Sequence, residues 1–267
     1  MSGRLEYKYL VPNDVLPQLR NELRPYVSDK PAGGSQYPNA YTVRSIYYDT
    51  LGFQCYDEKD AGIRVRNKFR IRGYARPNEN SIVFLEIKRK DGGFIDKHRA
   101  PVLRRDLRAL LDSRDIERYV IGARQDEIVR RDAERFLYHY HRFGLHPATL
   151  VVYDREAFSS RFDPSLRLTF DKALRQFMSP EIEQLYDEPC LAPTMYRSFV
   201  FEVKFFRYAL PRWVTSIISR YELPRLALSK YTMCLDTVPS PAMSAQGRGR
   251  RFARRLEPIP PSESSPC

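Results

Sequence analysis

Charged and hydrophobic residues alternate with a period of two along several stretches of the chain, and most of the charges are basic. The clearest stretch carries its cations at Arg66, Lys68, Arg70 and Arg72. A period of two is typical of a β-strand, because successive side chains of a strand point to opposite faces. Like charges along one strand face repel one another, so these rows favour an anionic molecule placed against them.

The alternating stretches predict about eight strands, with helices between them. The expected strands cover residues 4–10, 41–48, 63–75, 81–90, 94–99, 149–157, 165–171 and 198–206. The expected helices follow Pro12 and Pro211, fill 52–60, occur twice within 100–146 and begin once more within 228–235. Residues 172–197 contain prolines at irregular spacing and are expected to lack regular structure.

Two architectures can accommodate strands with one charged and one apolar face. A flat sheet would expose the charged faces to water, which is the usual arrangement for a single amphipathic strand. Long exposed faces normally mix charges of both signs, however, whereas these faces are mostly basic. A closed barrel can turn the charged faces inward, and eight strands can enclose one small ligand. We therefore expect an α+β fold, a β-barrel with a cation-lined lumen and helices packed outside.

Composition and charge agree with one basic globular domain. The chain has 267 residues, of which 42% are hydrophobic, and this is enough for one large core. A formal net charge of +12 indicates an anionic partner or a basic surface that aids solubility. We expect a domain over residues 1–237. Residues 238–267 should form a disordered basic tail rich in Pro, Ser and Arg, either a solvated extension or an electrostatic tether.

Several classes of protein are disfavoured by what the chain lacks. It contains no signal peptide and no apolar run long enough to span a bilayer, so we expect a cytoplasmic protein. Neither a P-loop nor a Rossmann glycine motif is present. The strand faces that carry the cations are expected to lack aromatic residues, with tyrosines such as Tyr47 and Tyr74 in the core. Sequence-specific nucleic acid is therefore not an expected partner.

Eight short motifs are the most specific feature of the sequence. They are Arg4-Leu-Glu6-Tyr-Lys8-Tyr9, Ser45-Ile46-Tyr47-Tyr48-Asp49-Thr50, Lys68-Phe-Arg70-Ile-Arg72-Gly-Tyr74, Leu85-Glu86-Ile-Lys88, Tyr153-Asp-Arg155, Leu166-Arg167-Leu-Thr169-Phe-Asp171, Phe201-Glu202-Val-Lys204-Phe205 and Ser229-Lys230-Tyr231. In this order and spacing, over residues 4–235, they resemble the VTC domain. That domain is the polyphosphate polymerase branch of the CYTH, or triphosphate tunnel metalloenzyme, superfamily.

The resemblance implies an eight-stranded antiparallel β-barrel, a tunnel that binds nucleoside triphosphate or polyphosphate with a divalent metal. It implies a polyphosphate polymerase, which transfers the terminal phosphate of ATP to a growing inorganic polyphosphate chain. Two alternatives stay open: a tunnel triphosphatase that transfers the phosphate to water, and a non-catalytic polyphosphate-binding module. Eukaryotic relatives work in membrane complexes, which leaves room for a separate membrane-protein partner. Base preference, oligomeric state and the direction of the net reaction stay open.

The resemblance also implies roles for individual residues. Those assigned to phosphate binding and catalysis are Lys8, Arg70, Arg72, Lys88, Arg155, Arg167 and Lys230. Further cations expected to bind substrate in second rank are Arg66, Lys68, Lys90, Lys97, Arg99 and Lys204. The divalent metal, Mn²⁺ or Mg²⁺, is expected on Glu202, with Glu6 as a weaker ligand. Relatives that hydrolyse triphosphate carry a glutamate where this chain has Arg4, and this difference favours the polymerase.

Overall fold

A computed structural model describes residues 5–28, 39–74, 80–92, 94–187, 190–206 and 209–238. The strands are β1 (Leu5–Pro12), β2 (Ala40–Asp49), β3 (Val65–Arg66), β4 (Phe69–Tyr74), β5 (Ile82–Asp91), β6 (Phe94–Leu103), β7 (His146–Ser159), β8 (Arg167–Met178), β9 (Ala192–Pro193) and β10 (Ser198–Phe205). The α-helices are α1 (Leu16–Leu23), α2 (Gln54–Asp60), α3 (Leu107–Ser113), α4 (Ile116–Tyr119), α5 (Glu127–Arg142), α6 (Arg212–Arg220) and α7 (Lys230–Asp236). Short 3-10 helices cover Asn13–Val15, Arg104–Asp106 and Ile182–Leu185.

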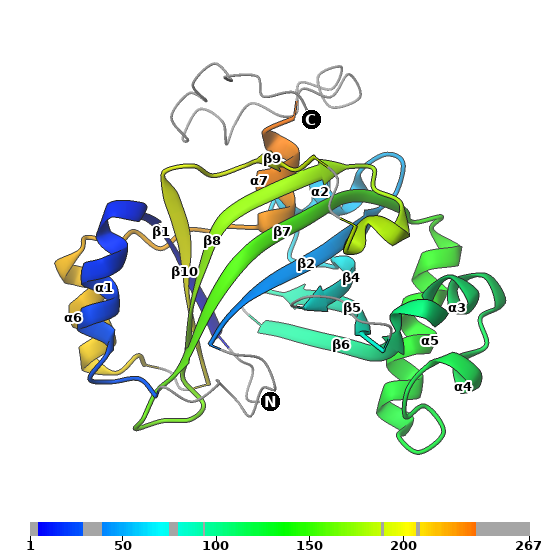
Figure 1. The fold of residues 1–267 in the computed structure, drawn as a ribbon, viewed down its shortest axis with the longest axis horizontal. Coiled ribbons are helices and arrows are strands. Elements are labelled where there is room, and N and C mark those ends of the chain that lie inside the picture. Colours follow the sequence, from blue (N-terminus) through cyan, green and yellow to red (C-terminus); the bar gives the residue numbers. More distant parts are fainter. Residues whose placement is uncertain are drawn as a thin grey trace.

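All strands belong to one antiparallel sheet, which curves across the molecule (Figure 1). The order is β1-β10-β8-β7-β2-β4-β5, and β5 continues its pairing with β3 and with β6. Each of the eight predicted strands is present, although the stretch over 63–75 is divided into β3 and β4. The fold is therefore α+β with a large antiparallel sheet, as expected.

The expected closed barrel is wrong, because the sheet is open. Among the described residues, β1 pairs only with β10 and β6 pairs only with β5. A backbone ladder between the two edges would bring them to about 4.8 Å. Charged side chains connect the two ends of the sheet instead, since Lys88 on β5 reaches Glu6 on β1. Because most of these side chains are cations, closer approach would increase their repulsion.

The predicted irregular segment over 172–197 is also partly wrong, since β8 continues to Met178 and β9 pairs with it. The register between β7 and β8 shifts between Val152 and Asp154. Opposite this shift, Ala173 has a φ of 48°, in the left-handed region. A bulge of this kind inserts an extra residue and changes which face the following side chains occupy. The alternation therefore breaks at Ala173 although the strand does not end there.

The apolar face of the sheet is covered by two groups of helices at opposite ends (Figure 1). At one end, α1 and α6 bury Leu19 and Ile217 against the aromatic side chains of β10. At the other end, α3 and α5 bury Leu110 and Phe136 against β4 and β5. The residues between these apolar positions point to the opposite face. The period-two pattern of the sequence thus separates these two hydrophobic cores from the charged face.

A third group of buried residues fixes α2 and α7 to the sheet. The carboxylate of Asp49, at the end of β2, accepts hydrogen bonds from the backbone N–H groups of Cys55 and Tyr56 at 2.9 and 3.0 Å. It also accepts a hydrogen bond from the hydroxyl of Tyr231 on α7 at 2.5 Å. One buried carboxylate therefore holds both helices, and through them it positions Lys59 and Lys230.

Within the described residues, no helix is both long and apolar enough to cross a membrane. The expected tail over 238–267 lies outside the described residues except for Val238.

Candidate functional site

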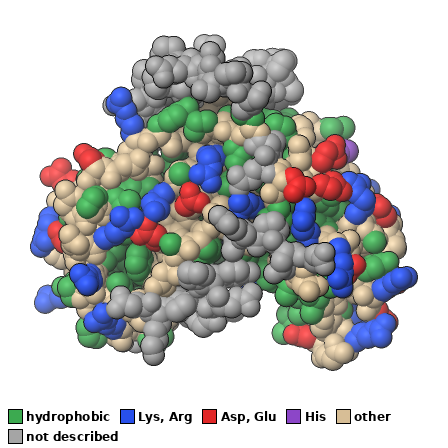
Figure 2. All heavy atoms as spheres, viewed as in Figure 1, with side chains coloured by type: hydrophobic (Ala, Val, Ile, Leu, Met, Phe, Trp, Pro, Cys, Tyr) green, Lys and Arg blue, Asp and Glu red, His purple; other side chains and the backbone are tan. Residues whose placement is uncertain are grey.

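The charged face of the sheet contains a cavity of about 1180 Å³. Basic and acidic side chains gather in the middle of the face shown in Figure 2. Every cation assigned to the first rank lines the cavity, namely Lys8, Arg70, Arg72, Lys88, Arg155, Arg167 and Lys230. So do Lys68, Lys97, Arg99 and Lys204 from the second rank, and both proposed metal ligands, Glu6 and Glu202. Arg66 and Lys90 line a smaller cavity beside it. Arg4 lies outside the described residues.

Glu202 is the centre of one group of cations. It lies on β10, in register with Lys8 on β1, and its side chain is only 4% exposed. Its Oε1 atom is 2.9 Å from the Nζ atom of Lys230 and 3.6 Å from that of Lys8. Its Oε2 atom is 2.7 Å from Lys204 and 3.4 Å from Arg155. Burial alone would raise the pKa of Glu202, but these four cations outweigh it and hold the pKa well below its usual value.

Asp171 supports the same group from β8. Arg155 donates to both of its carboxylate oxygens, with distances of 2.6 and 2.7 Å, and this bidentate pair is fully buried. The Nζ atom of Lys230 lies 2.5 Å from the same carboxylate. Asp171 belongs to one of the eight sequence motifs, but the sequence alone assigned it no role. Its partner became visible only with the register, which places Arg155 of β7 directly opposite Asp171 of β8.

Glu86 is the centre of a second group of cations, on the other side of the cavity. It is completely buried on β5 and accepts a hydrogen bond from Arg70 Nε at 2.7 Å. The Nζ atom of Lys97 and the Nε atom of Arg99 lie 2.6 and 3.3 Å from its Oε1 atom. Burial would raise the pKa of Glu86, but Arg70, Arg72, Lys97 and Arg99 together hold it well below its usual value. Glu86 therefore carries a negative charge that fixes several cations in place.

Glu86 also belongs to a sequence motif without an expected role. The register explains its surroundings, because Arg70 of β4, Glu86 of β5 and Arg99 of β6 form one row across three neighbouring strands. Directly opposite residues in an antiparallel sheet have their Cβ atoms about 5 Å apart. The expected strands over 81–90 and 94–99 contained both residues, but only the register of the structure shows that Glu86 lies opposite Arg99.

A fourth carboxylate, Glu6, joins the two sides of the cavity. Its Oε1 atom is 3.1 Å from the Nζ atom of Lys8, and its Oε2 atom is 2.8 Å from that of Lys88. Lys8 is shared, since it also lies near Glu202. The cavity is therefore lined by carboxylates as well as cations, and the carboxylates hold many of the cations in position.

Some of the lining cations have donors to spare. Lys68 and Arg167 make no ion pair with any described residue, and Arg72 approaches Glu86 only to 4.0 Å. Lys68 donates to the hydroxyl of Ser229 at 2.5 Å, and Arg167 donates to that of Tyr41 at 3.2 Å. The Nε atom of Arg167 is buried without a hydrogen-bond partner. A buried cation without a counter-charge is costly, so these three cations favour an anionic ligand in the cavity.

Tyrosines also line the cavity, which contradicts the expectation that the charged face lacks aromatic residues. Tyr47, Tyr74 and Tyr153 are all part of the lining. The hydroxyl of Tyr47 accepts a hydrogen bond from Arg70 at 3.0 Å, and that of Tyr153 accepts one from Arg72 at 3.4 Å. The rings of Tyr47 and Tyr153 are buried while their hydroxyls orient the arginines. These tyrosines act as supports for the cation groups.

The carboxylates suit a divalent ion only if a phosphate ligand accompanies it. No group of three or more His, Cys, Asp or Glu side chains within the described ranges is placed to hold a metal. However, Glu6 and Glu202 converge on a single cation, the ammonium group of Lys8. Mg²⁺ is commonly bound by one or two carboxylates, with phosphate oxygens and water completing its coordination. The donor set therefore fits an Mg²⁺ or Mn²⁺ ion that binds together with phosphate.

Comparisons with known proteins place the chain in a family. Two solved structures resemble it weakly. One is a putative adenylyl cyclase from Hippeastrum, described as having a dominant triphosphatase activity. It is 13% identical, with a TM-score of 0.42 over 90% of this chain and 98% of its own. The other is the Mediator head module of Schizosaccharomyces pombe, 10% identical, with a TM-score of 0.40 over 82% of this chain and 90% of its own. Both scores are too low to support an argument.

None of the curated proteins compared with the chain matches it. The family model of the VTC domain, in contrast, matches residues 3–238 and so covers every strand and helix described above. The motifs that resemble this domain in the sequence are those that supply the cations and carboxylates of the cavity. The chain therefore belongs to the VTC domain family.

Proposed function

We propose that this protein is a polyphosphate polymerase that transfers the terminal phosphate of ATP to a growing inorganic polyphosphate chain. The observation that carries the proposal is the set of incompletely paired cations, Arg72, Arg167 and Lys68, in a cavity where buried carboxylates already hold cations such as Arg70 and Arg155. Such a site suits a ligand that carries many negative charges and few other groups to be recognised. The membership of the VTC family supports the same substrate class.

The chemistry requires positioning and charge neutralisation more than a protein nucleophile. An arginine can bind phosphate through two parallel N–H donors, and it stays protonated at any relevant pH. Arg70 and Arg155 are already oriented by bidentate or paired contacts with Glu86 and Asp171. Little reorganisation is then needed when charge develops on the phosphate oxygens, and this is the main source of electrostatic stabilisation in enzymes.

The roles of single residues follow from their positions. Arg72 and Arg167 would bind the oxygens of the donor triphosphate, since both have donors that no described carboxylate occupies. Lys8, Lys88 and Lys230 would add further positive charge from the positions in which Glu6 and Glu202 hold them.

Glu202, with Glu6, would hold a divalent ion brought in with the triphosphate. When bound, the ion would neutralise charge on the phosphate oxygens. Its binding would require Lys8 to move from the position between the two carboxylates, which are 3.1 and 3.6 Å from its Nζ atom.

The test is incubation of the purified protein with ATP and Mn²⁺ or Mg²⁺. Products are separated on a gel stained for polyphosphate, and free phosphate is measured in parallel. A ladder of chains together with ADP supports the polymerase. Free phosphate without chains would indicate a triphosphatase instead, and binding of polyphosphate without turnover would indicate a binding module.

Arg167→Gln is the most informative variant for this assay. Arg167 makes no ion pair with the described residues, so its removal leaves no buried carboxylate without a partner. Arg175→Gln, on the same strand but outside the cavity lining, is the matched control. Chain synthesis should fall at least about a hundredfold in Arg167→Gln and stay near the wild-type rate in Arg175→Gln.

A further inference from the structure

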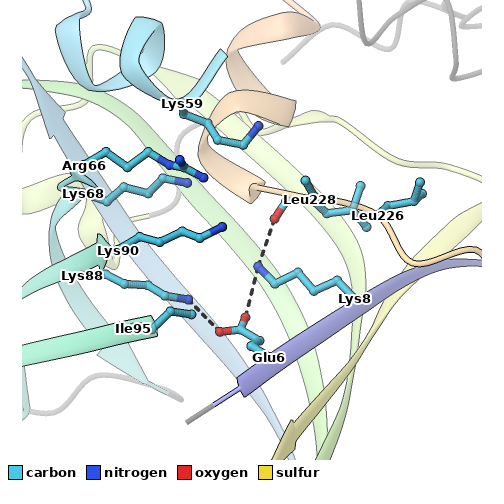
Figure 3. Close-up of a pocket in the computed structure, with 11 residues that line it drawn as sticks. Glu6, Lys8, Lys59, Arg66, Lys68, Lys88, Lys90, Ile95, Leu226 and Leu228 are labelled. Atoms are coloured by element: carbon cyan, nitrogen blue, oxygen red, sulfur yellow. Dashed lines mark hydrogen bonds and ion pairs between the residues drawn. The ribbon is translucent and has the colours of Figure 1, made fainter. Parts of the chain in front are cut away.

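A second, smaller cavity opens beside the main one, and we call it the annex. It has a volume of about 140 Å³ and shares Glu6, Lys8, Lys68 and Lys88 with the main cavity. Its remaining charged residues, Lys59, Arg66 and Lys90, line the annex alone. Figure 3 shows these side chains pointing into a common space from α2, β3 and β5. The opposite wall is apolar and comes from Leu226 and Leu228.

The annex differs from the main cavity in its balance of charge. Six cations line it, namely Lys8, Lys59, Arg66, Lys68, Lys88 and Lys90, against the single carboxylate of Glu6. That carboxylate already contacts Lys8 and Lys88 at 3.1 and 2.8 Å. The other four cations make no ion pair with any residue that the structure describes. Among the described residues, no carboxylate is in ion-pair contact with these four cations, although Asp60 and Asp236 act on Lys59 from a greater distance.

The cations of the annex are close enough to disturb one another. Burial is the largest cause that lowers the pKa of Lys68, and the neighbouring charges of Lys8 and Lys88 lower it further. Burial also lowers the pKa of Lys90, followed by the charges of Arg66 and Lys59. An anion in their midst would relieve this repulsion and compensate the loss of hydration.

The size of the annex restricts the ligand. Pockets that bind drug-sized molecules usually measure about 300–1,000 Å³, so 140 Å³ is too small for a nucleoside. A phosphate group is compact, carries its charge on several oxygens and suits a cluster of lysines and an arginine. The wall formed by Leu226 and Leu228 is held in place by two hydrogen bonds to Lys8. Leu226 N–H donates to Lys8 O at 2.9 Å, and Leu228 O accepts from Lys8 Nζ at 3.0 Å.

We propose that the annex is a second phosphate-binding site, distinct from the seat of the donor triphosphate, which takes an inorganic phosphate ion or the terminal phosphate of an acceptor chain. Binding at the annex does not depend on the proposed polymerase, but its role as the acceptor site does. In that role, an oxygen of the acceptor's terminal phosphate attacks the γ-phosphorus of ATP. The bond from that phosphorus to the β,γ-bridging oxygen breaks, ADP leaves with the electron pair, and the chain grows by one phosphate.

The test measures phosphate binding while the main cavity is occupied. The full chain is saturated with a non-hydrolysable ATP analogue and titrated calorimetrically with inorganic phosphate. The test variant is Lys59→Gln/Lys90→Gln, because neither lysine side chain makes a hydrogen bond or ion pair within the described ranges and neither lines the main cavity. The control is Arg124→Gln/Arg131→Gln, which removes the same charge from exposed positions outside both cavities.

We expect wild type and control to bind phosphate in the presence of the analogue, and the test variant to bind it at least tenfold more weakly. Equal binding by the test variant, or loss of all phosphate binding when the analogue is present, would overturn the proposal.

A second titration with tripolyphosphate separates the two sources of the phosphate group, the free ion and the chain end. If the binding of tripolyphosphate also depends on Lys59 and Lys90, the annex takes the end of a chain. If only the binding of inorganic phosphate depends on them, the annex takes the free ion. A protein that passes these titrations but makes no chains from ATP refutes the polymerase and leaves the annex standing.

Discussion

The Nζ atom of Lys88 lies 2.8 Å from the Oε2 atom of Glu6, and this ion pair joins two strands that share no backbone hydrogen bond. Lys88 belongs to β5 and Glu6 to β1, which stand near opposite ends of the strand order. The two ends of the sheet are thus linked by side chains, and a ligand that competes for Lys88 or Lys8 also acts on this link.

This relationship predicts that Glu6→Gln destabilises the free protein and that an anion restores it. The substitution leaves Lys8 and Lys88 with less compensation in a site where the Glu6 side chain is only 8% exposed. We expect the free energy of unfolding, measured with urea, to fall by about 1–3 kcal/mol. Tripolyphosphate should recover most of this loss, because its oxygens can replace the carboxylate. Glu134→Gln, which removes an exposed helical ion pair, is the control and should change stability little.

Glu86→Gln should be more severe than Glu6→Gln. Glu86 is fully buried among Arg70, Lys97 and Arg99, and removal of one partner from a buried charge group costs about 3–5 kcal/mol. Urea unfolding measures the loss, and far-UV circular dichroism confirms that the variant is folded. An effect below that of the Glu6 variant would show that water compensates these cations.

The same residue predicts an acid response. The pKa of Glu86 in the folded protein is held well below its usual 4.5, so its ionised form stabilises the fold above that pH. This contribution is lost as the pH falls below about 4.5 towards the folded-state pKa, where the group at last takes up a proton. Unfolding free energies measured between pH 7 and pH 3 should therefore fall less steeply in Glu86→Gln than in the wild type. Parallel curves would contradict the assignment.

Lys204 predicts how ligand binding depends on alkaline pH. Burial lowers the pKa of Lys204 to about 8, against the attraction of Glu202. Its charge is therefore lost as the pH rises through about 8, and the cavity then attracts phosphate less. We expect the affinity for tripolyphosphate to fall roughly three- to tenfold between pH 7 and pH 9. In Lys204→Arg the side chain stays charged, so the decline should be shallower, and an equally steep decline would argue against Lys204.

Gly73 predicts a packing defect next to the site. A Cβ atom at this position would collide with the hydroxyl of Tyr186, which also lies 3.2 Å from the backbone nitrogen of Tyr74. Gly73→Ala should therefore destabilise the protein by about 1–3 kcal/mol, as measured by urea unfolding. Combining it with Tyr186→Leu should cost less than the sum of the two single changes, because the second substitution removes the colliding ring. Strict additivity would show that the two residues do not interact.

The period of two made the charged strand faces predictable from sequence. Residues such as Arg70 and Arg72 alternate with Phe69 and Ile71, and the structure places the first pair in the cavity and the second in a hydrophobic core. Which face of a strand a residue occupies depends on whether its position is odd or even along that strand. This is local information, so it can be read from a single sequence. The break at Ala173 shows its limit, because a bulge changes parity without ending the strand.

The roles of Glu86 and Asp171 needed information of a different kind. Whether a carboxylate faces water, a metal or an arginine depends on the residue opposite it, and that is fixed by the register between strands. To predict that the sheet is open would require even more information than the register of one strand pair. The strands β1 and β6 are far apart in sequence, and their relative position depends on every strand between them. Local patterns do not specify such long-range geometry.

The pairing of β1 with β10 has a consequence for how the protein is made. Of the described strands, β1 is the first to leave the ribosome and β10 the last, yet Lys8 and Glu202 are direct neighbours across them. Lys230, which completes the contacts of Glu202, follows later still. Folds dominated by such distant contacts form slowly, and the unpaired strand is open to wrong associations meanwhile. The cavity can therefore take its final form only after almost the whole domain has been synthesised, which makes its assembly a late step of folding.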